Sequence, residues 1–192
     1  MATGTSSNVT ASKPRIAGSV FRAATTATKP TDATSSLGAA FTALGYVSED
    51  GVTNGNNPET EQVKAWGGDV VLNTLTGKED TFKFKLLEAL NVDVLSAVYG
   101  SSNVSGTLAT GITVKAKSDD LEESMYVIDM ILKNNVLKRI VIPNATISEV
   151  SEISYKDADA VGYEITIMAT PDASGYTHYE YIKQSSSPTP AS

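Results

Sequence analysis

Few residues of this chain have side chains suited to catalysis, and His178 is the first to consider. The 192 residues contain one histidine and no cysteine, which excludes thiol nucleophiles, disulfides and thiolate metal sites. A catalytic imidazole requires a nucleophile and an orienting carboxylate. In the strand predicted over 176–182, only Tyr176 and Glu180 share its face. We interpret His178 as part of an aromatic edge strand and expect no catalytic, cofactor-binding or metal-binding residue, hence a protein that is not an enzyme.

Two polar segments could bind a ligand or a partner. The acidic residues 119–123 could hold a hard cation through their oxygens, but they lack the alternating spacing and turn glycine of a calcium loop. We therefore favour a solvated loop there. Residues 48–58 are long, polar and predicted to form a flexible loop that could carry contacts, although no Gly-Lys-Ser/Thr phosphate cradle is present.

The net charge of −7 argues against a protein whose main task is to grip nucleic acid, because that grip depends mainly on Lys and Arg. The charge is uneven: residues 1–37 carry +3 and residues 38–192 carry −10. A basic arm could dock on the acidic body, within one molecule or between copies. Alternatively, the arm charges keep a solvated tail soluble. No apolar run approaches the roughly 18 residues of a membrane span, and we expect neither a membrane partner nor a secretory signal.

Composition divides the chain into three parts. Residues 1–37 are rich in Thr, Ser and Ala and predict an extended N-terminal arm rather than a core element. Residues 38–183 hold the folded domain, and we expect this domain to fold without residues 1–36. Residues 184–192 are rich in Ser and Pro and predict a disordered C-terminal tail.

Alternation of apolar residues predicts strands through most of the folded domain. Asn134 and Asn135 tolerate a positive φ and predict a tight hairpin. The strand after this turn, residues 136–142, is expected to end at Pro143. Gly67 and Gly68 suggest a bulge or a close backbone approach, with Trp66 packed beside them. The predicted strands cover residues 40–48, 59–66, 69–74, 81–86, 124–132, 136–142, 163–169 and 176–182.

One segment has helical spacing. Leu90, Val94 and Val98 recur every four residues, while Asn91 can cap the start and Gly100 suits the end. We expect this stripe to seal one open side of a sheet; the alternative is a helix that binds a partner. The sequence therefore predicts a mainly β fold, a two-sheet antiparallel sandwich or half-barrel with one short α-helix.

Six blocks, in the same order along residues 37–182, resemble the tail tube proteins of long-tailed phages. Each block alone is ordinary β-rich sequence, and the ordered recurrence makes the resemblance specific. The blocks are 44–52 (LGYVSEDGV), 64–68 (KAWGG), 82–92 (FKFKLLEALNV), 94–100 (VLSAVYG), 138–145 (KRIVIPNA) and 162–166 (GYEIT).

The resemblance implies a structural virion protein that forms hexameric rings. The rings stack into a tail tube, contact other tail proteins and let genomic DNA pass through the lumen without specific binding. Since the chain has a net charge of −7, we expect this tube to be an acidic conduit for DNA ejection. It also implies assembly in the host cytoplasm. For the contacts between copies, we expect the basic arm, residues 13–29, and the segment 48–58 to order against neighbouring subunits.

Two other functions stay open at this point. The tube of a contractile injection or secretion apparatus shares this architecture. A monomeric β-sandwich that binds carbohydrate or a cell surface is the alternative from a different class; such modules expose aromatic residues, whereas Trp66 is expected to be packed. An enzyme is the weakest alternative, given one His and no Cys.

Overall fold

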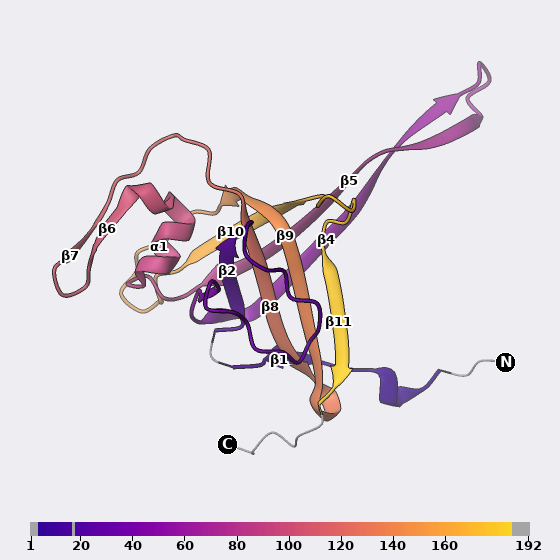
Figure 1. The fold of residues 1–192 in the computed structure, drawn as a ribbon. Helices are drawn as coiled ribbons and strands as arrows, with labels where there is room; N and C mark the ends of the chain where they lie inside the picture. Colours follow the sequence, from indigo (N-terminus) through magenta and orange to yellow (C-terminus); the bar gives the residue numbers. More distant parts are fainter. Residues whose placement is uncertain (1–3, 17, 186–192) are drawn as a thin grey trace.

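The computed structural model describes residues 4–16 and 18–185, and antiparallel strands dominate it (Figure 1). Within this part of the chain, a nine-stranded sheet runs in the order β3-β2-β8-β9-β10-β5-β4, with β1 paired to β8 and β11 paired to β9. A separate hairpin, β6–β7, and one α-helix complete the fold. The prediction of a mainly β, antiparallel fold with one short helix is confirmed. The elements are β1 Ser12–Pro14, β2 Val20–Ala24, β3 Thr42–Ala43, β4 Val47–Lys64, β5 Val70–Leu86, α1 Val92–Tyr99, β6 Val104–Thr107, β7 Gly111–Val114, β8 Ser124–Leu132, β9 Val136–Val150, β10 Tyr163–Thr170 and β11 Tyr179–Gln184, with short 3-10 turns at Ser6–Asn8, Ser101–Asn103 and Lys133–Asn135.

The main core forms where the inner faces of the strands meet. Phe82 and Phe84 alternate along β5 and are buried opposite Ile167 and Ile165 of β10. Side chains from β2, β8 and β9 join the same cluster, as do those of α1. Burial of this alternating set stabilises the fold through the removal of apolar surface from water.

The helix α1 seals this core as predicted. The Asn91 side chain accepts a hydrogen bond from the backbone N–H of Asp93 at 2.9 Å, and Gly100 follows the helix with φ +91°. Val94 and Val98 are buried in the main core. Leu90 was expected in the same stripe, but it is exposed, because it precedes the cap and lies outside the helix.

The β8–β9 connection confirms the predicted hairpin, since Asn134 and Asn135 have φ of 61° and 58°. The prediction that Pro143 ends the strand is wrong, because β9 continues to Val150. Pro143 lies between the part of β9 that pairs with β11, up to Val141, and the part that pairs with β10, from Asn144. On the other edge of β9, the pairing with β8 shifts register between Ile142 and Ala145, so the missing N–H of Pro143 falls where neither ladder is regular.

The expectation that residues 1–37 contain no core element is wrong for part of that segment. Residues 20–24 form β2, which pairs with β8, and Val20 is completely buried. Further along, Leu37 and Phe41 pack on Val127 of β8, on the face opposite the main core. Strand β8 can be apolar on both faces because the main core covers one face and the segment around Leu37 and Phe41 covers the other.

Several predicted boundaries also change. Strand β3 is limited to Thr42–Ala43 rather than 40–48, and β11 begins at Tyr179, one residue after His178. Of the predicted C-terminal tail, Gln184 belongs to β11, and residues 186–192 lie outside the described residues. The boundaries of the arm, domain and tail otherwise stay predictions.

Candidate assembly interface

A long hairpin made by β4 and β5 projects from the body (Figure 1). The two strands pair from Val47 and Leu86, inside the body, to Lys64 and Val70 near the tip, and the root of the hairpin is the point near Asp80 where it leaves the body. Large apolar patches on a protein surface mark interaction sites, and a two-stranded ribbon has no core of its own. The part of the β4–β5 hairpin near its tip carries six apolar residues that are each at least 50% exposed: Val63, Trp66, Val70, Val71, Leu72 and Leu75.

The tip of the hairpin carries the only tryptophan. A turn closes between Ala65 and Gly68, where the Gly68 N–H donates to the Ala65 carbonyl at 2.8 Å and Gly68 has φ +95°. The glycine pair therefore makes the turn rather than a bulge or a close packing site. Trp66 is fully exposed, so the expectation that it is packed is wrong.

Residues 48–58, expected as a flexible loop, are part of strand β4. This run of polar residues has no apolar alternation to indicate a strand, because its outer part projects into solvent on both faces. Strand β4 is the last in the sheet order, so its outer edge has no strand partner among the described residues. An unpaired edge offers N–H and C=O groups to another strand.

At the root of the hairpin, His178 meets a residue that the sequence analysis did not pair with it. Its Nδ1 lies 2.5 Å from Oδ2 of Asp80 on β5, and its ring packs edge-on against Phe82. The Thr177 hydroxyl donates to the same carboxylate oxygen at 2.5 Å. The imidazole thus does not lie between a hydroxyl and a carboxylate, as a nucleophilic triad requires.

The Asp80 carboxylate is almost completely buried and is held as an anion. Burial raises the pKa of Asp80, but hydrogen bonds from Thr177, Asn54 and His178 outweigh it, so the pKa lies below its usual value. The Asn54 amide donates to Oδ1 at 2.8 Å. One buried carboxylate thus accepts three hydrogen bonds from two distant parts of the chain, which indicates a structural role for the cluster.

The basic arm is docked on the acidic body of the same molecule. Lys29 contacts Asp172 at 2.9 Å, and Arg15 lies 3.6 Å from the buried Asp129. The interpretation of the arm as a solvated tail is therefore wrong for these residues.

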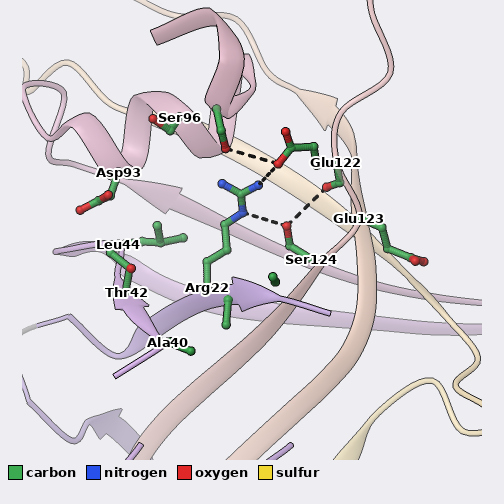
Figure 2. A pocket seen from close by; sticks show the side chains of 12 residues that line it. Arg22, Ala40, Thr42, Leu44, Asp93, Ser96, Glu122, Glu123 and Ser124 are labelled. Atoms are coloured by element: carbon green, nitrogen blue, oxygen red, sulfur yellow. Dashed lines mark hydrogen bonds and ion pairs between the residues drawn. The ribbon is translucent and has the colours of Figure 1, made fainter. Parts of the chain in front are cut away.

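A third contact of the arm lies in an open pocket of about 400 Å³ between α1 and the start of β8. Figure 2 shows the Arg22 side chain there, directed at Glu122, with their charged atoms 3.7 Å apart. Arg22 Nε also donates to the Ser124 hydroxyl at 2.9 Å. The acidic segment 119–123 is exposed apart from the partly buried Leu121, and part of it balances this arginine. Within the described ranges, no three His, Asp or Glu side chains are placed to hold a metal ion.

The outer face of β5 and β10 is polar and, unlike that of β8, is not closed by the arm. It presents Lys83, Lys85, Glu164 and Thr166, which are exposed or half-buried. Lys83 and Glu164 form an ion pair at 2.6 Å. The hydrogen bond between them raises the pKa of Lys83 and lowers that of Glu164, so both are charged at neutral pH and balance each other.

Comparison with known proteins identifies a protein family that the chain matches. The model of a family described as phage tail tube protein matches residues 1–192, the whole chain. No curated protein matches significantly. In the described part of the chain, no helix has the length and apolar character needed to cross a membrane.

Proposed function

Because the chain belongs to the phage tail tube protein family, we propose that it forms hexameric rings that stack into a hollow tail tube for DNA ejection. The family makes the chain a structural component of the virion tail that assembles with itself and with other tail proteins. The ring number, the stacking, the passage of DNA and assembly in the host cytoplasm are the proposed parts.

The observation that supports self-assembly is the β4–β5 hairpin. Its apolar side chains are exposed to water, and covering them with another protein surface would lower the free energy. A projecting element that enters a different surface of the next copy makes a head-to-tail contact, which closes into a ring or continues into a stack. The free edge of β4, which includes residues 48–58, is the second proposed contact.

Fewer residues of the N-terminal arm are proposed to contact a neighbouring copy than the sequence predicted. Of residues 13–29, those in β1 and β2 pair with β8 of their own chain, and Lys29 pairs with Asp172. Residues 4–9 are exposed and precede both these strands and Thr10, whose hydroxyl accepts the backbone N–H of Lys133. They are the part of the arm that we propose contacts a neighbouring copy.

We propose that the polar face of β5 and β10 lines the bore. Duplex DNA carries about one negative charge per 1.7 Å of axis, and cationic surfaces bind it through counterion release. On this face Glu164 pairs with Lys83 and also lies near Lys85, so the two lysines are partly balanced, in a chain with a net charge of −7. A like-charge pair ~8 Å apart in water costs about 0.5 kcal/mol, so many such weak repulsions between the acidic chain and DNA would prevent adhesion without blocking passage.

Electron microscopy of the purified full-length protein tests the proposal. Rings or tubes of uniform diameter are expected as the concentration rises. Protein that stays monomeric at high concentration would contradict the tube, and glycan binding by such a monomer would support the carbohydrate-binding alternative. Trp66, which is exposed, is the aromatic residue that such a module would offer to a glycan.

A further inference from the structure

The point where the hairpin leaves the body is marked by a buried charge. Asp80 is 1% exposed and is the first buried residue of β5, in phase with the core residues Phe82 and Phe84. The pairing of β5 with β10 begins at the next residue, Thr81, which lies opposite Met168, and continues to Leu86. Among the described residues, the part of β5 from Val70 to Asp80 therefore has β4 as its only strand partner, and sheet pairing no longer attaches the hairpin to the body.

The segment 171–178, between β10 and β11, makes the contact at this point. Its last two residues, Thr177 and His178, each reach Oδ2 of Asp80 at 2.5 Å. The Asn54 amide of β4 holds Oδ1, so both strands of the hairpin meet in one cluster. These contacts join parts of the chain that are 97 and 98 residues apart.

The other end of the segment is anchored as well. The Asp172 carboxylate accepts hydrogen bonds from Lys29 of the arm at 2.9 Å and from the Tyr179 hydroxyl at 2.7 Å. It also accepts the backbone N–H groups of Ser174 and Tyr176, which fixes the turn within the segment. Because the segment is short and anchored at both ends, it can move little, and it therefore restricts the movement of Asp80, which it contacts.

We propose that residues 171–178 form a brace that fixes the direction of the β4–β5 hairpin relative to the body, with Asp80 as the attachment point. The brace takes over where the pairing of β5 with β10 ends. Hydrogen bonds to a charged group are stronger than neutral ones, and a buried carboxylate that loses a donor is costly. The brace is a property of the single chain and does not depend on the proposed tube.

Two variants remove the attachment in different ways. His178→Phe keeps a ring against Phe82 but removes the hydrogen bond to Asp80. Asp80→Leu replaces the charge with an apolar side chain at a position in phase with the core, so the fold keeps its buried surface. Tyr176→Phe is the matched control, because it removes a hydroxyl from the same segment and leaves the contacts of Asp80 in place.

Hydrogen-exchange mass spectrometry on the full chain, at a concentration where it is monomeric, tests the brace. In both attachment variants, amides of residues 54–57 and 78–82 should exchange about tenfold faster or more. Residues 125–131 and 137–142 of β8 and β9 should keep the parent rate, and the control should match the parent throughout. Unchanged exchange at the hairpin root in both variants, or an equal rise in β8 and β9, would overturn the proposal. Neither result depends on whether rings or tubes form, so failure of the brace is distinguishable from failure of the tube.

Discussion

Arg139 and Asp129 lie directly opposite each other on β9 and β8 and form a two-point ion pair, Nε to Oδ1 at 2.6 Å and Nη2 to Oδ2 at 2.7 Å. Both residues are buried. The remaining nitrogen, Nη1, donates to the backbone carbonyls of Asp32 at 3.0 Å and Ser35 at 2.9 Å. One guanidinium thus joins two central strands to the segment that covers them.

Breaking this pair should destabilise the protein strongly. Arg139→Met removes both hydrogen bonds to the buried Asp129 carboxylate and leaves it the more distant Arg15, 3.6 Å away. We expect a loss of about 3–5 kcal/mol in the free energy of unfolding. The double variant Asp129→Leu with Arg139→Met should recover much of that loss, because Ile131 and Leu137 are apolar neighbours on the same strands. Urea unfolding measures both, and a single variant as stable as the parent would contradict the role of the pair.

Deletion of residues 1–36 should prevent cooperative folding. The deletion removes β1 and β2 from the edge of β8 and takes away the two carbonyl groups that Arg139 holds. This replaces the expectation that the domain folds without residues 1–36. Deletion of residues 1–9 is the control and should retain the parent thermal transition, measured by circular dichroism. A cooperative transition in the longer deletion would show that β8 tolerates an open edge.

Stability should fall at acidic pH, in part through Asp80 and Asp172. Hydrogen bonds from Lys29 and Tyr179 hold the pKa of Asp172 below its usual value, and the donors around Asp80 outweigh its burial to the same effect. A pKa that is lower in the folded state gives stability above the unfolded value, about 3.9, which is lost as the pH falls through the folded value. Asp80→Leu should flatten the loss below about pH 4, measured as unfolding free energy against pH. Parallel curves for variant and parent would contradict this.

The apolar hairpin should matter for assembly and not for folding. Trp66→Ser and Leu72→Ser change exposed side chains, so the free energy of unfolding should stay within about 0.5 kcal/mol of the parent. Tube growth, followed by light scattering and electron microscopy, should slow markedly. Gln62→Ser changes a polar residue of the same hairpin and is expected to assemble normally. Normal growth of both apolar variants would remove the hairpin from the interface.

Removal of a carboxylate from the polar face of β5 and β10 should slow DNA release. Glu164→Gln frees Lys83 from its ion pair and exposes a positive charge to the proposed bore. Glu180→Gln, which breaks a similar surface pair with Lys138 on the β9–β11 edge, is the control. Ejection kinetics of virions that carry each variant measure the effect. An unchanged rate for Glu164→Gln would mean that this face does not meet DNA.

Local patterns predicted the elements that depend on near neighbours. The alternation at Phe82 and Phe84, the cap at Asn91 and the positive φ at Asn134 are set by steric and hydrogen-bonding preferences within a few residues. The apolar residues near the tip, including Val70 and Leu72, also predicted a strand. Their exposure was missed, because a strand pattern does not say whether another layer covers it.

The sequence by itself determined a mainly β fold, a capped helix, an acidic chain and the absence of a cysteine-based or multi-histidine site, since these follow from composition and short-range geometry. Only the tertiary structure decided that 48–58 extends as a strand, that the arm completes the sheet and that Asp80 meets His178. Apart from Val52, which packs on the main core, residues 48–58 are polar, and from Val52 onward they gain their order from pairing with β5. Asp80 and His178 are 98 residues apart, and sequence spacing carries no information on contacts that the path of the sheet creates.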